Sequence, residues 1–245
     1  NAAGKSNALR GISFLINLIN GEGARFNDYR CIFTSNPIVT VEFEFRFNVK
    51  TLFYKIESNV KNGSISEEVL IDSISVLKRN GNAGELRIGE SITIDDKLDA
   101  NTLFLRTASF NTGRFPQEPT LRALMEYLQN SYVIDGYHKA ALFGDTISKY
   151  AEENGVENIN KYLEDFHYDF VVEYGSESEG AGVKVSVGSD NKMVFLKRKS
   201  FPTPNAIVRE SQGNQVFADM LPDLICVIEK PGMFVIDEFG NSLHN

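Results

Sequence analysis

The chain has no tryptophan, and only two cysteines and three histidines among its 245 residues. Cys31 and Cys226 lie far apart and lack the spacing of metal ligands, so we interpret both as reduced, structural side chains. His138, His167 and His244 stand in no catalytic-triad or metal-ligand pattern, and we expect the first two to lie at the surface or to pack. These absences leave no sequence support for a zinc site or a serine-type triad.

Long apolar runs and clustered positive charge are also missing. No run approaches the roughly 18 apolar residues that span a bilayer, and the start does not resemble a signal peptide, so we expect a cytoplasmic protein without membrane contact. The net charge of −8 argues against a general nucleic-acid clamp, because phosphate contacts need clustered Lys and Arg. The one dense basic run, Lys197-Arg198-Lys199, is expected to be a solvated strand end. Contact with DNA or RNA is left to a partner or to parts of the protein outside this chain.

The N-terminal stretch NAAGKSN contains the back half of a phosphate-binding loop, G-x-x-x-x-G-K-[ST]. Apolar residues recur at helical steps from Ala8 to Ile19, and Asn20-Gly21 ends the pattern, which predicts a half-buried helix. The N–H groups of such a helix would hold phosphates, Lys5 would reach the β- and γ-phosphates, and the Ser6 hydroxyl would bind Mg²⁺. The alternative is a chance Gly-Lys-Ser in a mobile N-terminus.

The C-terminal stretch GMFVIDEFGNSLHN has a short apolar run that ends in two acids. The run Met233 to Ile236 predicts a buried strand of a parallel sheet, whose carboxyl end is where ligands bind. Asp237 would then bind the Mg²⁺ shell and Glu238 would polarise a water. The alternative is a strand that ends in a solvated acidic turn. No second pair of acids supports a glycosidase or nuclease site, so we expect any nuclease activity to reside elsewhere.

A third segment, RESQGNQVFADMLPDLICVIEK, places Ser211-Gln212-Gly213 before an amphipathic helix that runs from Val216 to Ile228. A serine and a glycine at a helix N-terminus form a second anion cradle. One phosphate-binding subunit has no need of a second cradle. Two heads that close face to face over ATP do need one.

These segments resemble the P-loop, signature, Walker-B and D-loop motifs of ABC-type ATPase heads. More narrowly, NAAGKSNALRG, FLRTASFN, ESQGNQVFADMLPDL and FVIDEFGNSLHN resemble SMC-like ATPases of the overcoming-lysogenization-defect (OLD) type and their relatives in anti-phage systems such as PARIS, Septu and retron cassettes. The resemblance implies an α/β fold over residues 1–245: a P-loop NTPase head with an inserted antiparallel β subdomain and a short helical segment.

The resemblance also implies roles for individual residues. Lys5 and Glu238 would be catalytic, Ser211, Gln212 and Gly213 would act on the γ-phosphate bound by the opposite subunit, and Ser6 with Asp237 would hold Mg²⁺. The ATP-binding residues would be Asn1, Ala2, Ala3, Gly4, Lys5, Ser6 and Asn7. The D-loop would be Asn241, Ser242, Leu243 and His244, with His244 where the usual motif has Asp.

Three features depart from the family pattern. The first P-loop Gly is absent, no glutamine-loop residue can be assigned, and the chain ends before the His that ABC heads carry after the D-loop. We therefore expect this chain to be a fragment of a longer protein.

Between the motifs, alternation predicts an antiparallel subdomain over residues 38–95. Its strands are expected at 39–49, 52–57, 69–77 and 86–94, with a turn at Asn80-Gly81 and with Phe43, Phe45 and Phe47 in its core. Helices are expected at 118–133 and 144–166, the second broken at Asn154-Gly155, and together they form a helical insertion over 118–166. Strands are expected at 170–174, 183–187 and 193–197, with an acidic loop at 175–182 and a hairpin turn at 188–191.

The leading functional hypothesis is an ATPase head that binds ATP and Mg²⁺, forms a homodimer or higher oligomer over ATP, and controls an effector protein, a nuclease or toxin, in anti-phage defence. One alternative is an ATP-gated scaffold that sequesters the effector with little turnover. Another is chromosome maintenance or break repair, which predicts heptad arms that the sequence lacks. A transporter subunit is disfavoured because ESQGN lacks the Leu that usually opens the transporter signature.

Overall fold

The computed structural model describes residues 3–21, 26–30, 35–111, 113, 115–135, 145–188, 191–201 and 203–237. The chain is a mixed α/β protein that divides into two compact units, Asn1–Ser131 and Tyr132–Asn245, each of which is described by itself. No helix in these ranges combines the length and the hydropathy that crossing a membrane requires.

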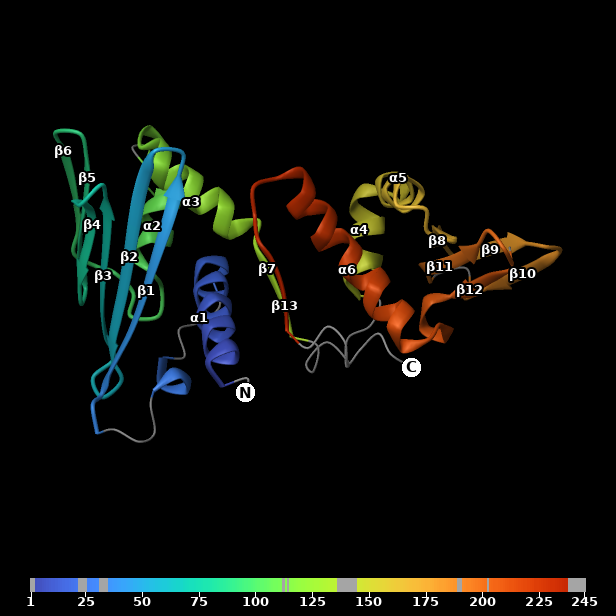
Figure 1. Ribbon diagram of the computed structural model, residues 1–245, viewed down its shortest axis with the longest axis horizontal. Helices are drawn as coiled ribbons and strands as arrows, with labels where there is room; N and C mark the ends of the chain where they lie inside the picture. Colours follow the sequence, from blue (N-terminus) through green and yellow to red (C-terminus); the bar gives the residue numbers. More distant parts are fainter. Residues whose placement is uncertain are drawn as a thin grey trace. The chain divides into compact units, whose positions relative to one another are not determined.

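The first unit consists of one sheet and the helices that cover it (Figure 1). Its elements in chain order are α1 (Ala3–Asn20), the 3₁₀ turn η1 (Phe26–Tyr29), β1 (Ile38–Phe47), β2 (Lys50–Asn59), β3 (Ser64–Ile71), β4 (Ile74–Asn80), β5 (Ala83–Ile88), β6 (Ser91–Asp95), α2 (Phe104–Asn111), η2 (Phe115–Gln117) and α3 (Pro119–Gln129). The six strands pair with their sequence neighbours in the order β1 to β6, all antiparallel. The predicted antiparallel sheet is therefore confirmed.

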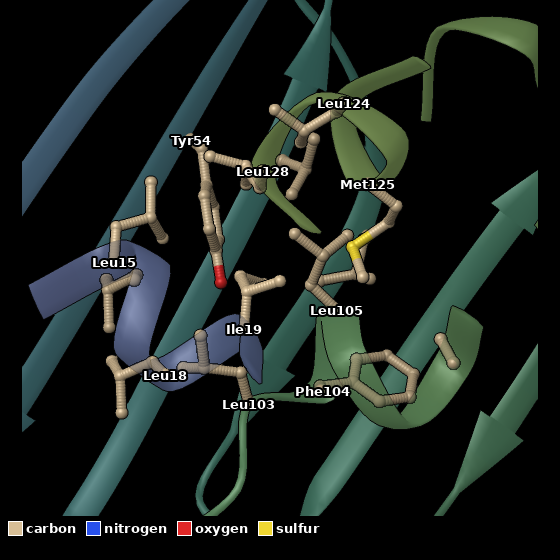
Figure 2. Packing of buried hydrophobic residues seen from close by; sticks show 14 of the residues in the cluster. Leu15, Leu18, Ile19, Tyr54, Leu103, Phe104, Leu105, Leu124, Met125 and Leu128 are labelled. Carbon is tan, nitrogen blue, oxygen red and sulfur yellow. The ribbon is translucent and has the colours of Figure 1, made fainter. Parts of the chain in front are cut away.

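The core of this unit lies between one face of the sheet and the three α-helices. Leu52, Tyr54 and Ile56 alternate along β2 toward the helices and are fully buried. Figure 2 shows Tyr54 with Leu15 and Ile19 of α1 and with side chains of α2 and α3. Burial of each large apolar side chain contributes about 1.5–3 kcal/mol, so this shared layer is the main source of stability for the unit.

Two of the predicted strands are in fact hairpins. The stretch predicted as one strand, 69–77, turns at Asp72 and Ser73, whose φ angles are 48° and 70°. The Asp72 carboxylate accepts a hydrogen bond from the Thr51 N–H at 3.0 Å, which compensates for a backbone conformation that glycine would adopt more readily. The stretch 86–94 turns at Gly89-Glu90. The turn predicted at Asn80-Gly81 lies one residue further on, at Gly81-Asn82, because Gly81 takes the positive φ of 60°.

The three phenylalanines of β1 share one face as predicted, but they are only half-buried. Phe43, Phe45 and Phe47 stack in a row with ring centroids 6.2 Å apart, and the last two contact Tyr127 of α3 edge-on. β1 is an edge strand, so its side chains have a neighbouring strand on one side only. The deepest core positions therefore lie on β2 and β3 instead.

In the part of the chain that is described, the second unit contains three small sheets and three α-helices. Its elements are β7 (Tyr132–Asp135), α4 (Asp145–Asn154), α5 (Glu157–Asp165), β8 (Phe170–Gly175), β9 (Glu177–Gly180), β10 (Val183–Ser186), β11 (Met193–Arg198), β12 (Pro204–Ala206), η4 (Ile207–Arg209), α6 (Gln212–Glu229) and β13 (Phe234–Asp237). The sheets are β12-β11-β8 and β9-β10, both antiparallel, and the parallel pair β7-β13. The described residues contain this one parallel pair, so the larger parallel sheet of a P-loop fold stays a prediction.

Three secondary-structure predictions in this part of the chain are wrong. The helix predicted to reach residue 133 ends at Gln129, and β7 begins at Tyr132 inside the segment 118–166. The predicted acidic loop 175–182 contains β9, which pairs with β10 through a turn in which Ala181 and Gly182 both have positive φ. The predicted hairpin between 183–187 and 193–197 is absent, because β10 pairs with β9 whereas β11 pairs with β8 and β12.

A buried ion pair fastens the first unit together. The side chains of Glu67 on β3 and Arg79 on β4 are 0% and 1% exposed and lie 3.3 Å apart. The Glu67 carboxylate accepts hydrogen bonds from the N–H groups of Phe104 and Leu105, at 2.6 and 3.3 Å, and from the Tyr54 hydroxyl at 2.9 Å. Glu67 therefore caps the N-terminus of α2, where unpaired N–H groups and the helix dipole favour a negative charge.

Arg79 completes this cluster by binding backbone carbonyls of the β4–β5 turn and of the segment that precedes α2. It donates to the carbonyls of Gly81 and Asp99, each at 2.7 Å, and to that of Thr102. Burial raises the pKa of Glu67, although the Phe104 N–H, Arg79 and Tyr54 all favour its charged form. The cluster therefore connects β3 and β4 to the 99–102 segment and to the N-terminus of α2.

The second unit has a comparable device. Asp219, in the middle of α6, is 3% exposed, and its Oδ1 accepts from the N–H groups of Thr146 and Ile147 at 2.8 and 3.1 Å. A carboxylate of α6 therefore caps the N-terminus of α4. Ile147 and Ala151 of α4 then pack with Leu221 and Ile225 of α6 in a shared core.

We expect Arg79→Met to destabilise the protein by about 3–5 kcal/mol, because the change leaves the Glu67 carboxylate buried without its counter-charge. Urea unfolding followed by far-UV circular dichroism measures the loss. Arg87→Met is the matched control, because Arg87 makes an exposed ion pair with Glu85 on the same sheet and its removal should cost less than about 1 kcal/mol. Equal losses in the two variants would contradict the role given to Arg79.

Candidate functional site

The predicted signature residues stand at the exposed N-terminus of α6. Ser211 is the N-cap, and its Oγ accepts a hydrogen bond from the Asn214 N–H at 3.4 Å. Ser211 and Gln212 are exposed, and Gly213 is half-buried. The first N–H groups of an α-helix have no acceptor within the helix, so this end can bind an anion brought by another molecule. The predicted helix and its start are confirmed; the role in ATP binding stays a prediction.

The carboxylate of Glu210, directly before the cap, holds this end of α6 in place. Its Oε2 accepts from Arg198 of β11 and from the Asn214 side chain, both at 2.8 Å. Its Oε1 accepts from the side chain of Asn205 on β12 at 2.9 Å. The backbone carbonyl of Glu210 accepts from the Gln215 side chain, also at 2.8 Å. Two strands and the first turn of α6 are therefore fixed to a single residue.

The charge of Glu210 is stabilised by this arrangement. Its side chain is 7% exposed. Burial acts to raise the pKa of Glu210, but hydrogen bonds from Asn214 and Asn205 and the charge of Arg198 outweigh burial, so the pKa is lowered. The carboxylate therefore stays ionised and keeps its partners well below neutral pH.

The predicted acid strand is β13, and it runs parallel to β7. The backbone register pairs Asp237 at the end of β13 with Asp135 at the end of β7. Ligands bind at the carboxyl ends of parallel strands, so the backbone places two aspartates at one such edge. The strand is half-buried rather than fully buried, because β7 is its one neighbour in the described sheet.

Helix α6 connects the signature end to the acid strand. Val216 and Met220 of α6 pack with Ile134 of β7 and with Phe234 and Ile236 of β13. The strand β13 runs back along α6 in the opposite direction (Figure 1). The carboxyl end of β13 is therefore packed against the N-terminal half of the signature helix.

The predicted P-loop segment opens α1. The backbone is helical from Ala3, so Gly4, Lys5, Ser6 and Asn7 lie in its first turns, and the helix ends at Asn20 before Gly21 at φ 96°. Phe14, Leu15, Leu18 and Ile19 bury its apolar stripe, which confirms the predicted helix.

The remaining predicted site residues lie outside the structure that is described. Asn1 and Ala2, the catalytic candidate Glu238, and the D-loop residues Asn241, Ser242, Leu243 and His244 are not among the described residues, nor are the side chains of residues 3–7 and of Asp237. Lys5 belongs to the first unit and Asp237 to the second. Within the described residues, no cluster of three or more His, Cys, Asp or Glu side chains could hold a metal, so the Mg²⁺ ligands stay a prediction.

The residues that hold the signature segment in place, and the aspartate of β7, were not predicted from the sequence. Lys197 and Arg198, predicted as a solvated strand end, instead pair with Glu173 and Glu210 across the second unit. The tripeptide Arg209-Glu210-Ser211 before a helix gives no sign that Glu210 forms an ion pair with Arg198, twelve positions earlier. The strand that ends at Asp135 could have been predicted, because its sequence YVID is nearly the same as FVID of β13, with which it pairs.

No family model, no curated protein and no solved structure matches the chain.

We expect Glu210→Gln to reduce stability at pH 7 by about 1–3 kcal/mol, the usual contribution of hydrogen bonds to a charged group. The pKa of Glu210 is lowered in the folded protein, so its contribution is present above the unfolded pKa and is lost as the pH falls through the folded value. The wild-type protein should therefore lose more stability than Glu210→Gln on acidification below about pH 4, measured by urea unfolding at each pH. Glu177→Gln, which removes an exposed ion pair with Lys184, is the control. Parallel pH profiles for wild type and Glu210→Gln would contradict this assignment.

Proposed function

We propose that this chain is the head of an ATPase that binds and hydrolyses ATP with Mg²⁺, dimerises over the nucleotide, and controls an effector protein in anti-phage defence. The proposal rests first on the resemblance of four segments to the heads of OLD-type and related defence ATPases. It is supported by the local structure of three of these segments, each taken by itself. A helix begins at the Gly-Lys-Ser segment, a parallel strand ends at Asp237, and a capped helix begins after Ser211.

The observation that carries the proposal is the signature end of α6. Its cap and its first residue are exposed, yet the segment is held by a buried carboxylate that contacts two strands. A helix end that only needed solvation would not require such bracing. A rigid, exposed anion cradle is instead what a partner subunit's γ-phosphate needs, because prepositioned N–H groups lower the reorganisation cost of charge stabilisation.

In the proposed reaction, Lys5 and the N–H groups of α1 hold the β- and γ-phosphates, while Ser6 and Asp237 carry the Mg²⁺ ion. Ser211 and Gly213 of the opposite subunit contact the γ-phosphate as charge develops on it. Glu238 accepts the proton of the attacking water, which adds to phosphorus in line with the departing ADP oxygen. The backbone register pairs Asp135 of β7 with Asp237 of β13.

We expect Glu238→Gln to bind ATP–Mg²⁺ normally and to hydrolyse it about a hundredfold more slowly, the scale for loss of a general base. Calorimetry measures binding and phosphate release measures turnover in the intact protein. Lys5→Ala is the control that should lose binding itself. Unchanged turnover in Glu238→Gln would remove Glu238 from the mechanism. Wild-type protein that binds ATP but shows no measurable turnover would instead favour the ATP-gated scaffold.

We expect Lys5→Ala and Ser211→Arg to be inactive alone and to recover part of the wild-type rate when mixed. In a mixed dimer, one composite site has an intact P-loop and an intact signature, whereas the other site carries both lesions. The matched control is Ser186→Arg, which puts the same side chain on an exposed strand serine and should leave turnover unchanged. Ser211→Arg that hydrolyses ATP at the wild-type rate by itself would contradict a face-to-face dimer.

A further inference from the structure

A second surface of the second unit has features that ATP binding does not use. Helices α5 and α6, together with Tyr168 just before β8, line a groove of about 320 Å³. Its walls include Tyr162, Phe166, Tyr168, Phe217, Leu224 and Ile228, and we call it the α5–α6 groove. Large apolar side chains remain accessible here: Phe166 is 59% exposed and Ile228 is 50% exposed.

Helix α6 explains why this face is apolar. One side of α6 packs on β7 and β13 through Val216 and Met220, and a second packs on α4, α5 and β8 through Leu221 and Ile225. Phe217, Leu224 and Ile228 widen this second side toward the solvent, and Leu221 and Ile225 line the groove together with them. The apolar face of α6 is therefore wider than its contacts with α4, α5 and β8 cover, and its exposed margin indicates a further contact.

The chemistry of the walls favours a helical polypeptide over a small ligand. A small-molecule site combines apolar walls with several convergent polar groups, whereas the polar groups on this lining are two tyrosine hydroxyls. The stretch from Phe217 to Ile228 is about 16 Å long at 1.5 Å per residue, which matches three turns of a helix laid in a groove. Aromatic walls, with Tyr168 and Phe217 ring centroids 4.7 Å apart, suit insertion of Leu, Ile or Met side chains.

Two acids, Glu229 and Asp165, lie beside the groove. Glu229, one residue beyond Ile228, accepts from the hydroxyl of Tyr162 at 3.4 Å and from the side chain of Asn158 at 3.0 Å, so both of these partners are neutral. Asp165 follows Tyr162 by three residues, within the same turn of α5, and no ion pair of Asp165 or Glu229 is found among the described residues. Loss of solvation and the carboxylates of Glu229 and Asp165 raise the pKa of Tyr162, a residue of the groove wall.

We propose that the α5–α6 groove binds a helical segment of a partner protein, about three turns long, with apolar residues on one face and Lys or Arg beside them. The apolar face fills the groove, and the basic side chains pair with Glu229 and Asp165. Such charges would fix the orientation of the segment more than its affinity. The proposal goes beyond ATP hydrolysis and can fail separately, because peptide binding is measured without nucleotide.

The test uses the intact protein and three fluorescein-labelled 18-residue peptides. The first has Leu at i, i+3, i+4 and i+7 with flanking Lys, the second has Glu in place of each Lys, and the third has the composition of the first in scrambled order. Fluorescence anisotropy should show the Lys peptide binding at least tenfold more tightly than either of the others. Ile228→Glu and Phe166→Ser, at half-exposed positions that do not threaten folding, should each weaken that binding at least tenfold.

A charge exchange makes the test specific to these two acids. The double variant Asp165→Lys with Glu229→Lys should reverse the preference from the Lys peptide to the Glu peptide. The control is Glu42→Lys with Glu44→Lys, the same change in net charge on exposed positions of β1, which should leave the preference unchanged. Equal effects of the two double variants would overturn the proposal, because the peptide would then respond to overall charge.

Two further outcomes would assign the groove to another occupant and overturn the proposal. Wild-type protein that sediments as an oligomer while Ile228→Glu is monomeric would show that a second copy fills the groove. Cosedimentation of wild type with phosphatidylcholine vesicles that Ile228→Glu abolishes would assign it to lipid.

Discussion

A buried carboxylate at the N-terminus of a helix that is distant in sequence is the interaction on which each unit depends. Glu67 reaches from the sheet to the first N–H groups of α2, and Asp219 reaches from α6 to those of α4. In both cases the acid satisfies backbone donors that would otherwise be buried unpaired, at a cost of several kcal/mol. Arg79 adds three carbonyls to the first cluster and so decides where the 99–102 segment must lie. The apolar layers provide most of the free energy, but these acids determine which helix packs where.

Glu210 is also a hydrogen-bonded carboxylate near a helix N-terminus, but it leaves the helix N–H groups accessible. It does not occupy the N-terminus of α6; it lies just before the cap, and it is held by Arg198, Asn205 and Asn214. The helix dipole therefore remains available at Ser211, whereas Glu67 and Asp219 neutralise the ends of α2 and α4. This contrast is the structural reason for placing function at α6. The α5–α6 groove lies along the side of the same helix, from Phe217 to Ile228, and uses its apolar side chains rather than its N–H groups.

Local sequence patterns predicted most of the helices and strands. The turns and side-chain contacts that they missed depend on residues distant in the sequence. Alternation along 38–47 and the spacing of Ala8 to Ile19 were sufficient for β1 and α1, and parallel β13 followed from a short apolar run. The turn at Asp72-Ser73 could not be predicted, because it depends on a hydrogen bond from Thr51 on a neighbouring strand. The bracing of the signature was invisible for the same reason: Glu210 meets partners on two other strands. The segment 175–182, rich in glycine and glutamate, is predicted as an acidic loop because these residues are depleted in strands. Its strand β9 depends on pairing with β10 and on the hydrogen bond from Ser178 to Glu173, which the local pattern does not reveal.

We propose that the braced end of α6 binds a nucleotide held by another subunit. The most direct measurement is a structure of the intact Glu238→Gln protein with ATP and Mg²⁺. We expect the Ser211 hydroxyl and the Gly213 N–H to lie about 3 Å from γ-phosphate oxygens of an ATP molecule whose other contacts come from Lys5 and Ser6 of the opposite subunit. An ATP molecule bound by Lys5 with no signature residue in contact, or with Ser211 of the same subunit, would contradict it.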